Sequence, residues 1–485
     1  MNAAGTASTG TSMSSAVQTV LSPQQIVEAA LQASRADGAV VVATTTSTAN
    51  VRWANNTVTT SGVSDSLSWF VVSVVSGAAA TVNASVSAAA TPATVAEVVR
   101  QSEREAAASA SAGRARDYAE LVDPAEAGGS AAGFDEPGAQ TSFEVYSRLL
   151  TDLGAAFDGA RSADRLLFGF ARHEMETSYL GTSTGIRRRW VQPTGTVELN
   201  AKTADLSGSA WSGASSRDFT EVDLLALSTA LGRRLDWAAR RLEIPAGRYD
   251  TVLPPTAVAD LMTSLAWSAG ARSAHEGHSA FSAPGGGTRI GEALTDLPLT
   301  LYSDPAYPGL ESAPFVLTGA SSDDFSVFDN GAAIGRTELV AGGKIAGLVH
   351  TRAAAAEYGV PFTTAADNLV LDGGDPSLTI DDLVAGVRRG LLVTSQWYIR
   401  EVDPMTLLMT GLTRDGVFLI ENGEVAGAVN NFRFNMSPLD VLRQAVTVAR
   451  TEPALSREWS DWFTRSAMPA MRVDGFNMSS VSKAQ

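Results

Sequence analysis

The stretch from Trp397 to Asp440 alternates short strand-like runs with polar turns, and it constrains the fold more than any other part of the chain. Runs rich in Val, Ile, Phe and Thr that are bounded by Gly, Asn and Asp are typical of strands. The same stretch holds more charged and amide side chains than a hydrophobic core needs. We therefore expect a β-rich carboxyl-terminal domain, with a functional site or an obligate interface in this stretch.

Composition restricts the classes of partner and of chemistry. The chain has 485 residues and a formal net charge of −16, which disfavours binding to nucleic acid and to anionic membrane surfaces. It contains no cysteine, which excludes disulfides, thiolate metal sites and a cysteine nucleophile. The amino end lacks the pattern of a secretory signal, and no apolar run reaches the roughly 18 residues of a membrane span. A cytoplasmic location is therefore expected.

The amino-terminal part predicts a mixed α/β domain over residues 22–116, after a disordered tail over residues 1–21. Ser22 and Gln25 can form a capping box with Pro23 at the first helical position, so a helix should run to about residue 34. A second helix is expected over residues 91–109. Between the helices, runs rich in Val, Thr and Trp predict consecutive antiparallel strands over residues 39–46, 51–60 and 67–75.

Residues 117–140 are rich in Ala, Gly, Pro and acidic side chains, which is typical of a linker. A middle α/β segment over residues 141–243 should contain helices over 141–157 and 220–241 and two long strands over 164–180 and 186–202. Residues 244–485 combine one expected helix, 255–270, with many short strands. These elements predict an α+β fold with a β-rich carboxyl-terminal domain.

His275, Glu276 and His278 are the candidates for metal-dependent catalysis. In the zinc peptidase motif H-E-x-x-H, two histidines at positions i and i+4 of a helix bind the metal and the glutamate activates water. Here the histidines lie at i and i+3 around Gly277, and His173 and His350 are the remaining histidines. A third ligand would have to be a carboxylate, so a pair of loop histidines is the favoured interpretation.

Glycine-rich segments elsewhere match catalytic motifs only in part. Gly181 to Gly185 fits G-x-S-x-G, but a nucleophile elbow needs a following helix and the next residues predict a strand. A hairpin turn is the favoured interpretation. Gly285–Gly287 and Gly342–Gly343 do not fit the phosphate-binding motif G-x-x-x-x-G-K-[ST] and predict tight turns. His350 is predicted to be structural.

Charged and amide side chains are dense between residues 400 and 435. Arginines beside carboxylates can form an acid/base site or a buried ion-pair network, and the network is favoured because pairing makes the burial of charge tolerable. The set comprises Arg400, Glu401, Asp403, Arg414 and Asp415. A strand would direct Asn431, Arg433 and Asn435 to one face and Phe432 and Phe434 to the other. Such amides could bind an extended peptide or hold a loop in place.

The motifs at the carboxyl-terminal end resemble the TldD/PmbA family of modulator metallopeptidases. The resemblance is carried by residues 397–404 (WYIREVDP), 410–416 (TGLTRDG), 430–435 (NNFRFN) and 437–439 (SPL), and more weakly by residues 51–55 and 179–185. Catalytic members of that family carry H-E-x-x-x-H and a downstream cysteine, whereas their partner subunits lack both. This chain has neither, and its residues 281–292 and 297–305 are similar to the partner type.

The resemblance implies a two-part assembly in which a zinc-bearing subunit pairs with a homologous metal-free one around a chamber for peptides or unfolded polypeptides. This chain would be the metal-free, TldE/PmbA-like subunit, with no catalytic residue or cofactor of its own, and zinc would lie in a TldD-like partner. Its substrate or interface residues would be Arg400, Asp403, Arg414, Asp415, Asn431, Arg433 and Asn435. Two alternatives stay open: a self-sufficient hydrolase of a small peptide or amide that uses His275, Glu276 and His278, and a homo-oligomeric binding protein.

Overall fold

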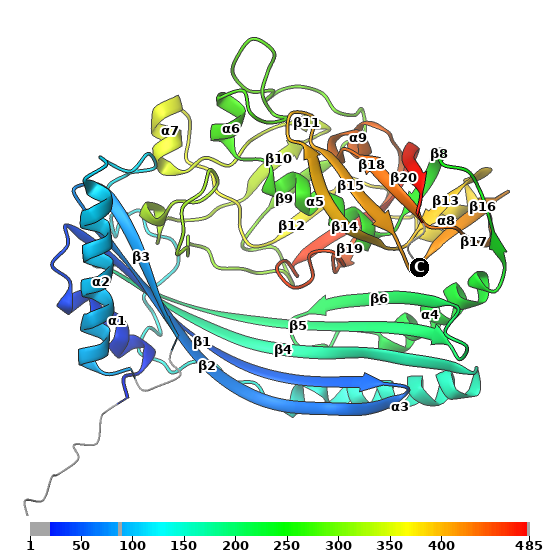
Figure 1. The fold of residues 1–485 in the computed structure, drawn as a ribbon, viewed down its shortest axis with the longest axis horizontal. Coiled ribbons are helices and arrows are strands. Elements are labelled where there is room, and N and C mark those ends of the chain that lie inside the picture. Colours follow the sequence, from blue (N-terminus) through cyan, green and yellow to red (C-terminus); the bar gives the residue numbers. More distant parts are fainter. Residues whose placement is uncertain (1–19, 86–89, 483–485) are drawn as a thin grey trace, which may run out of the picture.

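A computed structural model describes residues 20–85 and 90–482 of the chain, so nearly all of the predicted tail lies outside the described residues. Two sheets dominate the structure, a six-stranded antiparallel sheet in the amino-terminal half and a larger mixed sheet in the carboxyl-terminal half (Figure 1). The predicted α+β fold is confirmed.

The amino-terminal sheet has the strand order β3-β2-β1-β4-β5-β6, and its long strands curve beneath the carboxyl-terminal half (Figure 1). It contains strands from both sides of the segment 117–140. The strand bounds are β1 (Gly38–Ala54), β2 (Thr57–Val75), β3 (Ala78–Ser85), β4 (Arg165–Thr182), β5 (Arg187–Thr203) and β6 (Ser209–Ser216).

The prediction of three strands between residues 39 and 75 was wrong, because β1 and β2 are two very long strands. Residues 47–50 read as a polar break, yet they continue β1 in register with both β2 and β4. The chain turns instead at Asn55 and Asn56, which both have positive φ. Asparagine tolerates this left-handed conformation better than most residues, so the turn has a local cause.

Helices cover the amino-terminal sheet in two groups. At one end, α1 (Pro23–Ala33) and α2 (Pro92–Ala110) pack on β1, β2 and β3, and α1 begins with the predicted capping box of Ser22 and Gln25. Along the other part lie η1 (Phe143–Tyr146), α3 (Ser147–Ser162) and α4 (Leu224–Ala238). Tyr146, Leu149 and Leu231 belong to the apolar core that these helices share with β1, β4 and β5.

The segment 117–140 has no helix or strand and runs against both halves of the chain. Val122 is fully buried in a cluster with Phe315 and Phe328. Gly128 donates its N–H to the carbonyl of Gly331 at 3.0 Å, and a Cβ at Gly128 would lie 2.2 Å from the Pro314 oxygen. This close approach explains why glycine stands at position 128.

The carboxyl-terminal half is built around one mixed sheet. Its main strand order is β11-β10-β9-β12-β20-β8-β13-β16-β17-β7, with β14, β15, β18 and β19 joined at the side. The bounds are β7 (Arg241–Leu242), β8 (Gly247–Leu253), β9 (Thr300–Ser303), β10 (Thr337–Ala341), β11 (Lys344–Ile345), β12 (Leu369–Asp372), β13 (Arg389–Val393), β14 (Gln396–Asp403), β15 (Leu408–Thr413), β16 (Val417–Glu421), β17 (Glu424–Val429), β18 (Phe432–Met436), β19 (Ala445–Ala454) and β20 (Ser466–Val481).

The core of this half surrounds the helix α5 (Pro255–Trp267), whose residues 257–265 are all buried. Its apolar side chains pack against β8, β19 and β20, which is typical of a helix enclosed by a domain rather than lying on its surface. The remaining helices are short: α6 (Ala271–His275), η2 (Val327–Asp329), α7 (Arg352–Tyr358), α8 (Ile380–Ala385) and α9 (Pro438–Arg443), of which α9 packs against α5. Among the described residues, no helix has the length and apolar character needed to cross a bilayer.

Candidate functional site

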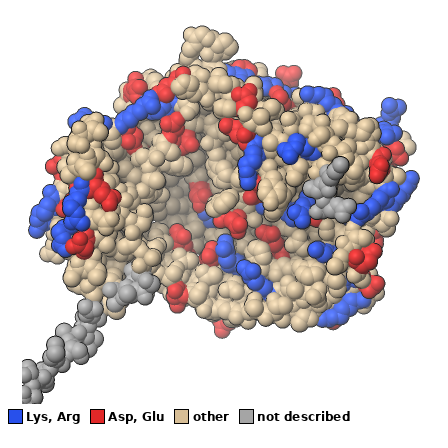
Figure 2. Space-filling model, viewed as in Figure 1, with Lys and Arg blue, Asp and Glu red and all other residues tan. Residues whose placement is uncertain are grey.

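A cavity of about 510 Å³ lies between the amino-terminal sheet and the carboxyl-terminal half. The surface in Figure 2 is hollowed between these two parts of the molecule. One wall comes from β4 and β5, and the other comes from α5, residues 313–317, residues 364–369 and residues 461–465. Cavities at the junction of structural units are the commonest places for ligands to bind.

Strand periodicity builds the polar floor of this cavity. Alternate residues of β4 line it, namely Arg172, Glu174, Glu176 and Ser178, because successive side chains of a strand point to opposite faces. The intervening Ala171, His173 and Thr177 are buried on the other face. On β5, Trp190, Gln192 and Thr194 stand opposite Ser178, Glu176 and Glu174.

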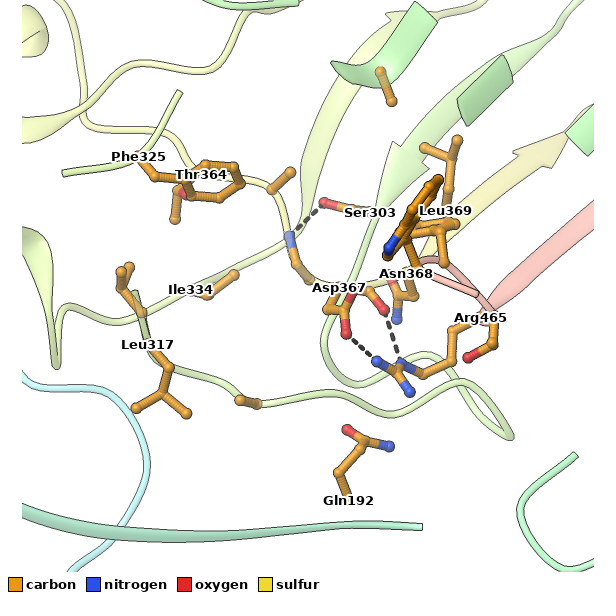
Figure 3. A pocket seen from close by; sticks show the side chains of 18 of the residues that line it. Gln192, Ser303, Leu317, Phe325, Ile334, Thr364, Asp367, Asn368, Leu369 and Arg465 are labelled. Carbon is orange, nitrogen blue, oxygen red and sulfur yellow. Dashed lines mark hydrogen bonds and ion pairs between the residues drawn. The ribbon is translucent and has the colours of Figure 1, made fainter. Parts of the chain in front are cut away.

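Two arginines at the cavity are already paired with carboxylates. The Arg172 Nε lies 3.6 Å from a Glu174 oxygen. Arg465 forms an ion pair with Asp367 (Figure 3). It also donates from Nη1 to Thr194 Oγ1 at 3.0 Å. Since Thr194 is on β5 and Asp367 is in the carboxyl-terminal half, Arg465 joins the two walls.

Three other carboxylates at the cavity, those of Glu176, Asp324 and Asp461, have no ion-pair partner among the described residues. Burial raises the pKa of Asp324 to about 6, with a further contribution from the neighbouring Asp323 carboxylate. Glu176 is exposed to solvent, although desolvation by the surrounding walls raises the pKa of its carboxylate. A cation placed between Glu176 and Asp324 would be attracted by both carboxylates.

The metal-site candidates lie outside this cavity, at α6 and the loop after it. His275 stacks on Tyr358 with ring centroids 3.8 Å apart, and its ring is 5.8 Å from that of His350. Burial lowers the pKa of His275, which favours the neutral imidazole. His278 leaves 73% of its side chain exposed. Its Nδ1 lies 3.8 Å from Glu276 Oε2, whereas the His275 ring is engaged with Tyr358.

Glu276 lies beside two arginines as well as His278. It pairs with Arg116, and Arg272 Nη1 lies 3.8 Å from Glu276 Oε1. Within residues 20–85 and 90–482, no group of three or more His, Asp or Glu side chains is arranged to hold a metal ion. The residues present do not fit the zinc site that the family resemblance implies for a catalytic member.

His350, predicted to be structural, is buried between two loop segments. Its Nδ1 lies 3.1 Å from both the Leu348 carbonyl and Thr363 Oγ1, while Nε2 has no partner among the described residues. Burial lowers its pKa. These contacts link His350 to the segment around Thr363.

The structure does not unite the predicted charged set in one network. Arg400 pairs with Glu458 at 3.1 Å and remains exposed. Asp403 accepts hydrogen bonds from Met405 N at 3.0 Å and from Thr406 Oγ1 at 2.7 Å, so it caps the turn between β14 and β15. Glu401 is exposed on β14. The turn satisfies the Asp403 carboxylate locally, and no arginine is needed there.

A buried ion pair does form, but with a residue outside the predicted set. Arg457 Nη2 lies 3.0 Å from Asp415 Oδ2, and the two side chains are only 10% and 11% exposed. Arg457 also lies over the rings of Trp397 and Trp211, 4.8 Å and 5.2 Å from their centroids. Because Trp211 is on β6, this cluster joins the two sheets.

Arg414 is peripheral to this cluster. Its Nε is 3.8 Å from Asp415 and 48% of its side chain is exposed. Sequence alone could not identify Arg457 as the main partner, because it lies 42 positions after Asp415 and outside the motif-rich stretch.

The alternation predicted for residues 432–435 is confirmed. Phe432 and Phe434 are fully buried, whereas Arg433 is exposed on the opposite face of β18. Asn435 Oδ1 accepts from Thr410 Oγ1 at 3.0 Å, and Asn431 accepts through its carbonyl from Ser482 N at 2.8 Å. Asn430 Oδ1 accepts from Ile244 N at 2.9 Å. These asparagines hold strands and loops of the chain itself.

The predicted turns are confirmed as well. Residues 183–185 connect β4 to β5, and Gly185 has a φ of 104°. Gly342 and Gly343 form the turn between β10 and β11 with φ values of 53° and 78°. Thus neither the G-x-S-x-G pattern nor the glycine pair marks a catalytic or phosphate-binding loop.

A known family matches the carboxyl-terminal half of the chain in sequence. Residues 246–480 match the family described as the PmbA/TldA metallopeptidase C-terminal domain. Residues 246–480 thus have the sequence pattern of the carboxyl-terminal domain of the PmbA/TldD family. The predicted resemblance to that family is therefore confirmed. None of the curated proteins compared with this chain matches it.

Solved structures share the fold of nearly the whole chain. TldE from Thermococcus kodakarensis has a TM-score of 0.74 at 16% identity, over 93% of this chain and 98% of its own. A putative modulator of DNA gyrase from Bacteroides thetaiotaomicron has a TM-score of 0.72 at 14% identity, over 95% and 98%. A putative modulator of DNA gyrase from Thermotoga maritima has a TM-score of 0.69 at 15% identity, over 91% of this chain and 95% of its own. At these identities the likeness establishes the fold.

Proposed function

We propose that this chain is the non-catalytic, metal-free subunit of a heteromeric cytoplasmic metallopeptidase that processes peptides or unfolded polypeptides. Its partner would be a homologous TldD-like subunit that carries H-E-x-x-x-H and holds zinc. The observation that carries the proposal is the geometry at α6: His275 stacks on Tyr358, His278 faces solvent and Glu276 pairs with arginines. A catalytic zinc site needs three converging ligands and an open position.

The surface around β14 supports a role in assembly. This strand pairs with β15 alone among the described strands, and Tyr398, Val402 and Met405 on it and its following turn are 56%, 55% and 49% exposed. Clustered exposed apolar side chains are typical of interaction surfaces. Arg400, Arg414 and Arg433 remain exposed in the same region, so they can contact a partner.

The cavity supports a role in handling a peptide. Its volume of about 510 Å³ is in the range of ligand-binding clefts, and its floor is a face of long strands with regularly spaced polar groups. A subunit without metal would contribute such a surface to the chamber and leave the hydrolysis to its partner.

Reconstitution tests this function. The purified chain is mixed with a homologous H-E-x-x-x-H subunit, and hydrolysis of an unstructured peptide is measured with and without a chelator. We expect no hydrolysis by this chain alone and chelator-sensitive hydrolysis by the mixture. A mixture containing the partner with its motif glutamate replaced by alanine serves as the control for the source of activity.

Two outcomes contradict the proposal. Hydrolysis by this chain alone that His275→Ala and Glu276→Gln abolish would support the self-sufficient hydrolase. Failure of the chain to associate with any metal-bearing homologue from the same cell would favour the homo-oligomeric binding protein.

A further inference from the structure

We propose that the cavity between β4–β5 and the carboxyl-terminal half binds the cationic side chain of an arginine or lysine in an extended peptide. This assignment deepens the proposed function by naming the substrate class, and it rests on that function for the peptide nature of the ligand. The recognition itself depends only on groups of this chain.

The charge balance of the lining is the first observation. Five carboxylates and two guanidinium groups line the cavity. Arg172 pairs with Glu174 and Arg465 pairs with Asp367, which leaves the carboxylates of Glu176, Asp324 and Asp461 without a cationic partner among the described residues. An added cation would therefore be attracted by three carboxylates, and neither arginine at the cavity lacks a carboxylate partner.

The second observation is a set of buried polar atoms without partners at the same cavity. Thr263, on α5, is fully buried and lines the cavity, and its Oγ1 has no hydrogen-bond partner among the described residues. Asp324 also lines the cavity, and its Oδ1, which packs against Gly270, is likewise inaccessible and without a partner among the described residues. Buried polar atoms are almost always hydrogen-bonded in folded proteins, so these two atoms mark polar groups next to the cavity whose hydrogen-bonding capacity is unused. Ammonium and guanidinium groups are donors only.

Aromatic side chains provide the third observation. Trp267, Phe325 and Trp462 line the cavity and are 44%, 42% and 73% exposed, although large apolar side chains are usually buried. A cation over the face of an aromatic ring is attracted by the ring's quadrupole. The aliphatic stem of Arg or Lys would at the same time cover apolar surface on Leu317 and Ile334, which lie at the other end of the cavity from Arg465 (Figure 3).

The floor of the cavity favours an extended peptide over a compact ligand. Glu174, Glu176 and Ser178 follow one another at alternate positions of β4, each opposite a polar or aromatic residue of β5. This repeat of two residues matches the spacing of side chains along an extended chain. A peptide lying along these strands would place one cationic side chain between Glu176 and Asp324.

The test is a binding measurement on the full chain without a partner subunit. Two acetylated, amidated tripeptides are compared by calorimetry and by tryptophan fluorescence, Ala-Arg-Ala and its citrulline analogue, which keeps the shape of arginine without the charge. We expect the arginine peptide to bind about tenfold more tightly or better, the effect of one charge-assisted hydrogen bond. Higher ionic strength should weaken this preference.

Variants locate the site. The double variant E176Q/D324N should lose the preference for arginine over citrulline, whereas Glu97→Gln should keep it, because Glu97 is on the exposed face of α2. Thermal melting of each variant checks that it is folded. Equal affinity of the wild-type chain for both peptides, no binding of either, or an unchanged preference in the double variant would overturn the proposal.

These results are separable from those of reconstitution. Arginine-selective binding by a chain that fails to activate any metal-bearing homologue would retain the cation site and refute the subunit role. Activation of a metal-bearing homologue by a chain without arginine-selective binding would retain the subunit role and refute the cation site.

Discussion

Replacement of Asp260 by asparagine should change how the stability of the chain depends on pH. Asp260 lies in the middle of α5 and is 1% exposed. Its Oδ1 accepts from Ser456 Oγ at 2.6 Å and from Glu458 N at 3.0 Å, while Oδ2 has no partner among the described residues. Burial raises the pKa of Asp260 to about 7, because the hydrogen bonds only partly offset the loss of hydration.

The sign follows from the higher affinity of the folded state for the proton. The contribution of Asp260 to stability is fully present below its unfolded-state pKa of about 3.9. It is lost as the pH rises through the folded-state pKa of about 7. The shift of roughly 3 pKa units corresponds to about 4 kcal/mol in total. Linkage places about 2–3 kcal/mol of this loss between about pH 5 and pH 8.

Asp260→Asn removes the titrating group and keeps Oδ1 as the acceptor for Ser456 and Glu458. The free energy of unfolding of the wild type and of the variant is measured by urea denaturation at about pH 5 and about pH 8. The variant should gain about 2–3 kcal/mol relative to the wild type as the pH rises.

Other buried acids with raised pKa values, such as Asp324 and Asp329, are present in both proteins and cancel in this difference. A difference between variant and wild type that does not change with pH would refute the reasoning. It would show that Asp260 is ionised in the folded chain over the whole range.

Three further predictions concern packing and charge. Arg457→Met should cost about 3–5 kcal/mol in a denaturation experiment, because the buried Asp415 carboxylate loses its close ion-pair partner. Arg414→Ala should cost less than about 1 kcal/mol, since Arg414 is half exposed and more distant; equal costs would contradict the assignment of Arg457 as the main partner. Phe434→Ala should cost about 3–5 kcal/mol, since Phe434 is fully buried, while the neighbouring Arg433→Ala should leave the melting temperature nearly unchanged. His278→Ala should leave both stability and partner-dependent hydrolysis unaltered, and a loss of hydrolysis would return this histidine to the catalytic candidates.

Local signals predicted the elements that depend on short-range chemistry. The capping box of Ser22 and Gln25 begins α1, and the glycines of residues 181–185 turn β4 into β5. In both, the residues that decide the structure are adjacent in sequence. By contrast, β3 was not predicted, since Ala and Ser are weak strand formers and its strand character comes from pairing with β2.

The candidate site shows the same limit. Alternation of Arg172, Glu174 and Glu176 on a predicted strand indicates a polar face, so one wall of the cavity had a signal in the sequence. The opposite wall comes from segments near residues 324, 367 and 465, and only tertiary structure brings them to β4. For the same reason the ion pair of Asp415 with Arg457 could not be found by reading the motif around Arg414.

The location of zinc in the native assembly tests the central claim most directly. The assembly is purified from its source through this chain, the subunits are separated under conditions that retain the metal, and the zinc content of each is measured. We predict about one zinc per H-E-x-x-x-H subunit and none with this chain, because His275, Glu276 and His278 do not form a three-ligand group among the described residues. About one zinc bound to this chain, and lost in His275→Ala, would contradict the account.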